Sequence, residues 1–61
     1  MERIYLEYTA YDIGLSEGVF FAQPVVGERI SGNTLDELAK SLALLNNTSS
    51  EEILDAIISS L

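Results

Sequence analysis

The sequence predicts a small α+β protein in which a three-stranded antiparallel sheet carries one helix across a face and a second short helix follows. Three observations lead to this expectation. Apolar and polar residues alternate in the first half of the chain, as they do in half-buried strands. Glycine and proline interrupt that half, as they do between strands. In the second half, apolar residues recur every three or four positions, which is typical of amphipathic helices.

The first strand is predicted over residues 3–11, where two sets of side chains alternate. We expect one set to face the core and the other to face solvent or a partner. The core set is Ile4, Leu6, Tyr8 and Ala10, and the opposite set is Tyr5, Glu7, Thr9 and Tyr11.

Residues 12–18 contain two glycines and two acids, so we expect a loose hairpin loop there. The second strand is predicted over residues 18–23. It should end at Pro24, which cannot donate a hydrogen bond to a neighbouring strand. Residues 25–27 then turn the chain, and residues 28–31 form a short third strand.

Thr34 and Glu37 have the spacing of a capping box, which predicts the start of the first helix. Asn46 and Asn47 should end it, because asparagine tolerates the left-handed conformation at a helix C-terminus. The apolar stripe between them is Leu35, Leu38, Ala39, Leu42 and Leu45.

Two overlapping capping boxes, Thr48 with Glu51 and Ser49 with Glu52, predict the second helix. Its apolar face has two explanations, which are packing on the sheet and self-association. Self-association would support the small core of a 61-residue chain. The expected dimer interface comprises Ile53, Ile57, Ile58 and Leu61.

The chain has the length of one domain, residues 1–61, and contains neither cysteine nor histidine. Disulfides and Cys/His zinc sites are therefore excluded. A bound partner or a homo-oligomer is the support that we expect instead. The sequence shows no signal peptide and no apolar run of about 18 residues, so we expect a cytoplasmic protein without a membrane partner.

Ten acidic residues and three basic ones give a net charge of -7. This charge argues against direct nucleic-acid binding, which needs lysine and arginine at the phosphates. It favours a basic protein partner through electrostatic steering. The simpler alternative is that the charge only maintains solubility.

We expect no catalytic residues, no metal and no cofactor. The commonest catalytic base, histidine, is absent, and the densest carboxylate group, Glu51, Glu52 and Asp55, is explained by its place at a helix start. A protein interface is expected around the aromatic residues of the first two strands, with cross-strand packing as the alternative. The candidate partner-binding residues are Tyr5, Glu7, Tyr11, Asp12, Glu17 and Phe20.

The segment from Gly18 to Leu38 resembles the N-terminal domain of HicB-type antitoxins. In that family a strand of the form Gly-aromatic-x-Ala-x-x-Pro is followed by a short return and a helix start of the form Gly-Asp/Asn-Thr-Leu-Asp/Glu-Glu. The chain has Gly18, Phe20 or Phe21, Ala22 and Pro24, and then the run Gly32-Asn33-Thr34-Leu35-Asp36-Glu37. Its turn, Pro24-Val25-Val26-Gly27-Glu28, departs from the usual Pro-x-x-Pro-Gly.

The resemblance implies a partial ribonuclease-H-like fold that binds and neutralises a small basic ribonuclease. Members usually continue into a DNA-binding domain, whereas this sequence continues into a short amphipathic helix. The favoured expectation is a non-enzymatic, antitoxin-like inhibitor of a basic nuclease or toxin. The alternatives are an anti-defence inhibitor from a phage or mobile element that mimics nucleic-acid charge, and a structural homodimer or accessory subunit.

Overall fold

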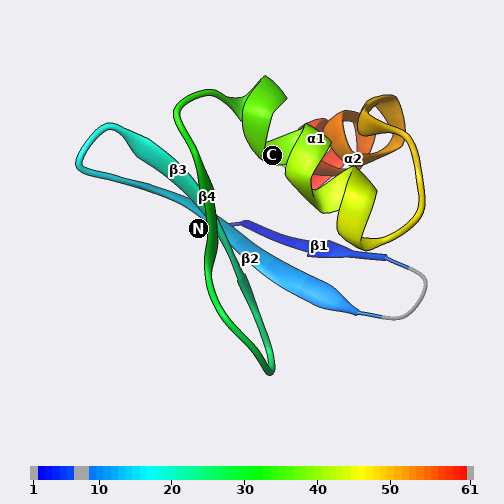
Figure 1. The fold of residues 1–61 in the computed structure, drawn as a ribbon, viewed down its shortest axis with the longest axis horizontal. Coiled ribbons are helices and arrows are strands. Elements are labelled where there is room, and N and C mark those ends of the chain that lie inside the picture. Colours follow the sequence, from blue (N-terminus) through cyan, green and yellow to red (C-terminus); the bar gives the residue numbers. More distant parts are fainter. Residues whose placement is uncertain (1, 7–8, 61) are drawn as a thin grey trace.

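Four strands form one antiparallel sheet, and two helices lie together on one side of it (Figure 1). The computed structural model describes residues 2–6 and 9–60. The strands follow one another across the sheet in chain order. The α+β class is confirmed, but the sheet has four strands rather than three. The elements are β1 (Glu2–Tyr5), β2 (Ala10–Ser16), β3 (Val19–Pro24), β4 (Ile30–Gly32), α1 (Leu35–Leu45) and α2 (Ser50–Ser60).

The single strand predicted over residues 3–11 is wrong, because the chain reverses direction between β1 and β2. The backbone N–H of Leu6 donates to the carbonyl oxygen of Thr9 at 2.8 Å. Ile4 then lies opposite Tyr11, so even positions of β1 share a face with odd positions of β2. Tyr11 therefore faces the core in place of Ala10. Glu7 and Tyr8 lie outside the described residues.

The hairpin between β2 and β3 has a tight two-residue turn, so the predicted loose loop over residues 12–18 is wrong. Asp12 to Ser16 belong to β2, and Ser16 pairs with Val19. Glu17 and Gly18 have φ angles of 53° and 79°. Two successive positive φ values are the mark of a type I′ turn, whose twist matches that of the flanking strands.

The end of β3 and the position of β4 follow the expectations closely. β3 ends at Pro24 as predicted, and β4 covers Ile30–Gly32 rather than residues 28–31. Gly32 lies directly beneath the start of α1, where a Cβ atom would be 2.8 Å from the backbone nitrogen of Leu38. A residue without a side chain is therefore needed for β4 to meet α1.

Both helices have side-chain caps. Thr34 Oγ1 accepts a hydrogen bond from the Glu37 N–H at 3.1 Å, and the Glu37 carboxylate accepts one from the Asn33 N–H at 2.8 Å. The predicted capping box is thus present, although Glu37 reaches one residue further back than in the standard form. Asn47 takes the left-handed conformation at the end of α1, with φ 53°.

Of the two residues predicted to cap the start of α2, only Ser49 accepts a hydrogen bond from a backbone N–H of the helix. Ser49 Oγ accepts from the Glu52 N–H at 3.3 Å. The Thr48 hydroxyl instead donates to the Glu52 carboxylate, so the predicted pairing of Thr48 with Glu51 is wrong. The four residues between the helices are enough to let α2 return along α1.

The core lies between the sheet and the helices. α1 packs on β3 and β4, and α2 packs on α1 and β1. Leu45, predicted to belong to the apolar stripe of α1, is exposed, and Ala43 is buried in its place. The buried cluster is Ile4, Tyr11, Ile13, Ala22, Leu38, Ala39, Leu42, Ala43, Ile53 and Ile57.

The type I′ turn predicts that Glu17→Asn stabilises the protein. Asparagine adopts positive φ more readily than glutamate and is preferred in this turn. We expect the free energy of unfolding to rise by about 0.5–1 kcal/mol in urea denaturation. Glu28→Asn is the control, because it removes the same charge at an exposed position and should change stability by less than about 0.5 kcal/mol. Equal effects of the two substitutions would contradict the role of the turn.

The close approach of β4 to α1 predicts that Gly32→Ala destabilises the protein by about 1–3 kcal/mol, because the added methyl group meets the backbone of the buried residue Leu38. Urea denaturation measures this loss in the free energy of unfolding. Ser31→Ala, at the exposed neighbouring position, is the control and should be nearly neutral. An unchanged midpoint for Gly32→Ala would show that the helix can move away at little cost.

Candidate functional site

The six residues predicted to bind a partner do not form one surface. Tyr11 is 6% exposed and belongs to the core, where its hydroxyl accepts a hydrogen bond from Asn46 at 3.2 Å, so its assignment to an exposed face is wrong. Tyr5 is 74% exposed at the edge of the sheet. Asp12 lies on the sheet face away from the helices, whereas Phe20 lies on the face toward them. Glu17 is in the hairpin turn, and Glu7 is outside the described residues.

The predicted dimer interface on α2 is mostly used within the chain. Ile53 and Ile57 are 0% and 2% exposed, because they pack in the core between α2 and the sheet. Neither side chain has surface left for a second copy. Ile58 is 62% exposed, and Leu61 lies outside the described residues.

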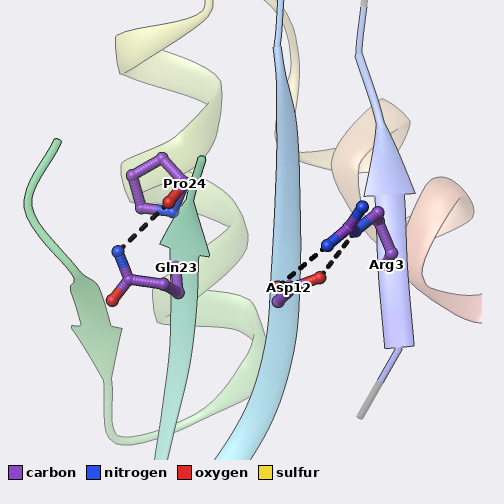
Figure 2. A network of polar contacts seen from close by, with 4 residues as sticks. All are labelled: Arg3, Asp12, Gln23 and Pro24. Carbon is purple, nitrogen blue, oxygen red and sulfur yellow. Dashed lines mark hydrogen bonds and ion pairs between the residues drawn. The ribbon is translucent and has the colours of Figure 1, made fainter. Parts of the chain in front are cut away.

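A polar row crosses the sheet face that the helices leave open. Arg3, Asp12 and Gln23 are register partners on three adjacent strands. Arg3 Nε and Nη2 donate to the two oxygens of Asp12 at 2.7 and 3.3 Å, which is a bidentate ion pair (Figure 2). Gln23 Nε2 donates to the Pro24 carbonyl oxygen at 3.1 Å, also seen in Figure 2, and Gln23 Oε1 accepts from Arg29 Nε at 3.4 Å.

The ion pair fixes the charge states of both partners. The hydrogen bond from Arg3 is the largest effect on Asp12 and lowers its pKa below the usual value; partial desolvation opposes this shift, and the positive charge of Arg3 adds a smaller lowering. The same contacts raise the pKa of Arg3. Asp12 is therefore a structural carboxylate, held ionised by its neighbour, and is not poised to exchange a proton near neutral pH.

The buried aromatic ring on the open face is covered by the protein itself. Phe21 lies opposite Gly14 and Ser31 and is 8% exposed, although it is outside the main core cluster. The Arg29 guanidinium carbon is 4.1 Å from the ring centroid, a cation–π contact. This stacking leaves the open face with a polar surface over its centre.

An apolar pocket of about 180 Å³ opens on the other face, where the β2–β3 hairpin meets the helical layer. Leu15 and Phe20 form its wall on the hairpin, and Leu35 and Ile57 form its wall on the helices. Leu15 is 61% exposed because the hairpin extends beyond the helices (Figure 1). The full lining is Glu2, Ile13, Gly14, Leu15, Phe20, Leu35 and Ile57.

Charges are distributed unequally between the two sides of the molecule. Both arginines lie on the open sheet face or the loop beside it, where they contact Asp12 and Phe21. The helices carry five exposed carboxylates and one cation, Lys40, which lies 3.8 Å from Asp36. The helix carboxylates are Asp36, Glu37, Glu51, Glu52 and Asp55. The helices, with five carboxylates and one lysine, have a net charge of -4, and we call them the acidic side; the rest of the chain, with five carboxylates and two arginines, has a net charge of -3.

Over residues 2–6 and 9–60, neither a metal-binding cluster nor a buried polar side chain is found. No group of three or more carboxylates is placed there to hold a metal ion. The buried side chains in the same ranges are all hydrophobic. No helix in the described part of the chain is long and apolar enough to cross a membrane.

Comparison of the chain with protein-family models, with curated proteins and with solved structures gave no match. Phe20, named from the sequence as a candidate partner-binding residue, lines the pocket, whereas Glu17 does not. The pocket itself was not predicted, because Leu15 lies in the segment expected to be a loop. A strand running through Gly14 to Ser16 would have placed Leu15 opposite Phe20.

The Arg3–Asp12 pair predicts a pH-dependent loss of stability that Asp12→Asn removes. Because the pKa of Asp12 is lower in the folded chain, its contribution is present above the unfolded pKa of about 3.9 and disappears as pH falls through the folded value. Urea denaturation between about pH 6 and pH 2.5 should show wild type more stable than the variant at the upper end, with the difference shrinking as the pH is lowered. A constant difference across this range would contradict the assignment.

Proposed function

We propose that the protein is a non-enzymatic, antitoxin-like inhibitor that binds a basic nuclease or toxin through its acidic side. The observation that carries this proposal is the segregation of charge. Five exposed carboxylates lie on α1 and α2, and both arginines lie at the opposite face of the sheet. The Arg3–Asp12 pair is neutral, so the carboxylates of the helices attract and orient a basic partner from a distance.

The resemblance to HicB-type antitoxins supports the same proposal. That resemblance implies a strand, a turn, a strand ending at proline, a short return strand and a capped helix. The segment from β2 to α1 has this order, with Pro24 ending β3 and Thr34 capping α1. The resemblance implies a sheet of three or four strands, so β1 is compatible with it, whereas the packing of α2 on β1 is additional.

The surface chemistry supports binding rather than catalysis. Arg3 and Asp12 form one exposed ion pair in which each partner stabilises the charged form of the other, which raises the pKa of Arg3 and lowers that of Asp12. A catalytic carboxylate or nucleophile usually has its pKa moved toward neutral pH by burial or by a like charge. The contacts of Asp12 move its pKa in the opposite direction.

The test begins with the immobilised wild-type protein and a bacterial lysate at low salt. We expect it to retain a basic protein with nuclease activity and to release that protein as salt is raised to about 0.5 M, because exposed charge pairs are then screened. Adding the purified protein in solution should abolish the nuclease activity. Retention of no basic protein at low salt, or retention of a nuclease whose activity is unchanged, would overturn the proposal.

The acidic side predicts that Asp55→Lys weakens this complex more than Glu28→Lys. Both positions are exposed and both substitutions change the net charge by the same amount, but Asp55 lies on α2 and Glu28 in the loop between β3 and β4. We expect association to slow roughly tenfold at low salt for Asp55→Lys, with a much smaller effect for Glu28→Lys. The association rates are measured by surface plasmon resonance. Equal rates for the two variants would mean that the net charge of the protein, and not the acidic side, determines the rate of association.

A further inference from the structure

The apolar pocket has the size and lining of a site for one side chain. Its volume is about 180 Å³, and all of its lining residues except Glu2 are apolar or glycine. An apolar cavity of about 150 Å³ in a protein core is large enough to hold benzene. A leucine or phenylalanine side chain therefore fits, whereas a whole helix or an extended sheet would not.

The side chains that form the walls of the pocket remain partly exposed to solvent. Leu15 is 61% exposed, and Phe20 and Leu35 are half-buried. An apolar group that entered the pocket would remove these surfaces from water without moving the core, because Ile13 and Ile57 beneath it are already packed. In protein interfaces, binding energy concentrates where a side chain fills such a pocket and is removed from water.

The charges beside the pocket indicate what flanks that apolar group. Glu2 is part of the pocket wall. Glu17 is in the turn that joins Leu15 and Phe20 across the hairpin, two residues from Leu15. The cation nearest in sequence, Arg3, is held by Asp12 on the opposite face of the sheet. A cationic neighbour of the apolar group is therefore attracted, and an anionic one is repelled.

We propose that the pocket receives one leucine- or phenylalanine-sized side chain from a basic segment of the partner protein, with lysine or arginine residues of that segment beside Glu2 and Glu17. This inference rests on the proposed function for the basic character of the partner. It adds that charge steers the partner and that a single apolar anchor holds it. The anchor governs dissociation, and the carboxylates govern association.

Blocked synthetic peptides test the anchor directly. The probe is Gly-Lys-Lys-Leu-Lys-Lys-Gly, titrated into the full-length ¹⁵N-labelled chain and followed by amide chemical shifts. We expect shifts at Leu15, Phe20 and Leu35. The same peptide with alanine in place of leucine should bind roughly fiftyfold more weakly if the whole side chain is buried, since it buries about three fewer carbon groups. The peptide with glutamate in place of lysine should not bind. Equal binding of the leucine and alanine peptides would overturn the inference.

Substitutions in the chain provide the second arm. Leu15→Gln should weaken the leucine peptide about tenfold and leave the alanine peptide unchanged. The control is Leu44→Gln, an exposed leucine on α1 that does not line the pocket, and it should have no effect. Both leucines are largely exposed, so both variants should stay folded, which unchanged dispersion of the amide spectrum will verify. An unchanged affinity of Leu15→Gln for the leucine peptide would contradict the pocket as the site.

The outcomes separate this inference from the function on which it rests. Salt-sensitive binding of all lysine peptides, with shifts at the exposed carboxylates of α1 and α2 and none at Leu15 or Phe20, would support the acidic side and contradict the pocket as the site. Leucine-dependent binding at the pocket, combined with a lysate that yields no basic nuclease, would support the pocket as a binding site and contradict the proposed inhibitor function.

Discussion

The register between β1 and β2 is the constraint on which the rest of the structure depends. Ile4 lies opposite Tyr11, and this single pairing decides which side of β2 faces the helices. Because side chains alternate along a strand, a shift of one residue would turn Tyr11 and Ile13 out to solvent and Asp12 into the core. The same register places Arg3 beside Asp12 and leaves Leu15 at the mouth of the pocket. The register between β1 and β2 therefore determines the positions of the core, the polar row and the pocket together.

The sequence predicted best those features that depend on local chemistry. The start of α1 at Thr34 follows from a hydroxyl and a carboxylate three residues apart, and its end follows from Asn46 and Asn47. Pro24 stops β3 because it has no N–H group. In each case the cause lies within a few residues of the effect, so no knowledge of the remaining chain is needed.

The failures concern reversals of the chain. Alternation continues from Ile4 to Tyr11 across the change from β1 to β2, so nothing in the pattern marked that turn. In the second hairpin Glu17 occupies a position of positive φ where asparagine or aspartate would have given a turn signal, and Gly14 suggested a loop although it lies in a strand opposite Phe21. The pocket could not be foreseen, since it exists only when Leu15 and Phe20 face each other.

The stacking of Arg29 on Phe21 has a consequence for behaviour at high concentration. A sheet with one uncovered face can stack on the same face of another molecule, and a bare aromatic ring at its centre would promote such association. The guanidinium lies over that ring at 4.1 Å and replaces it with a hydrated cation. The contact thus makes the uncovered face less apolar, so stacking of one molecule on another is less favourable than it would be over a bare ring.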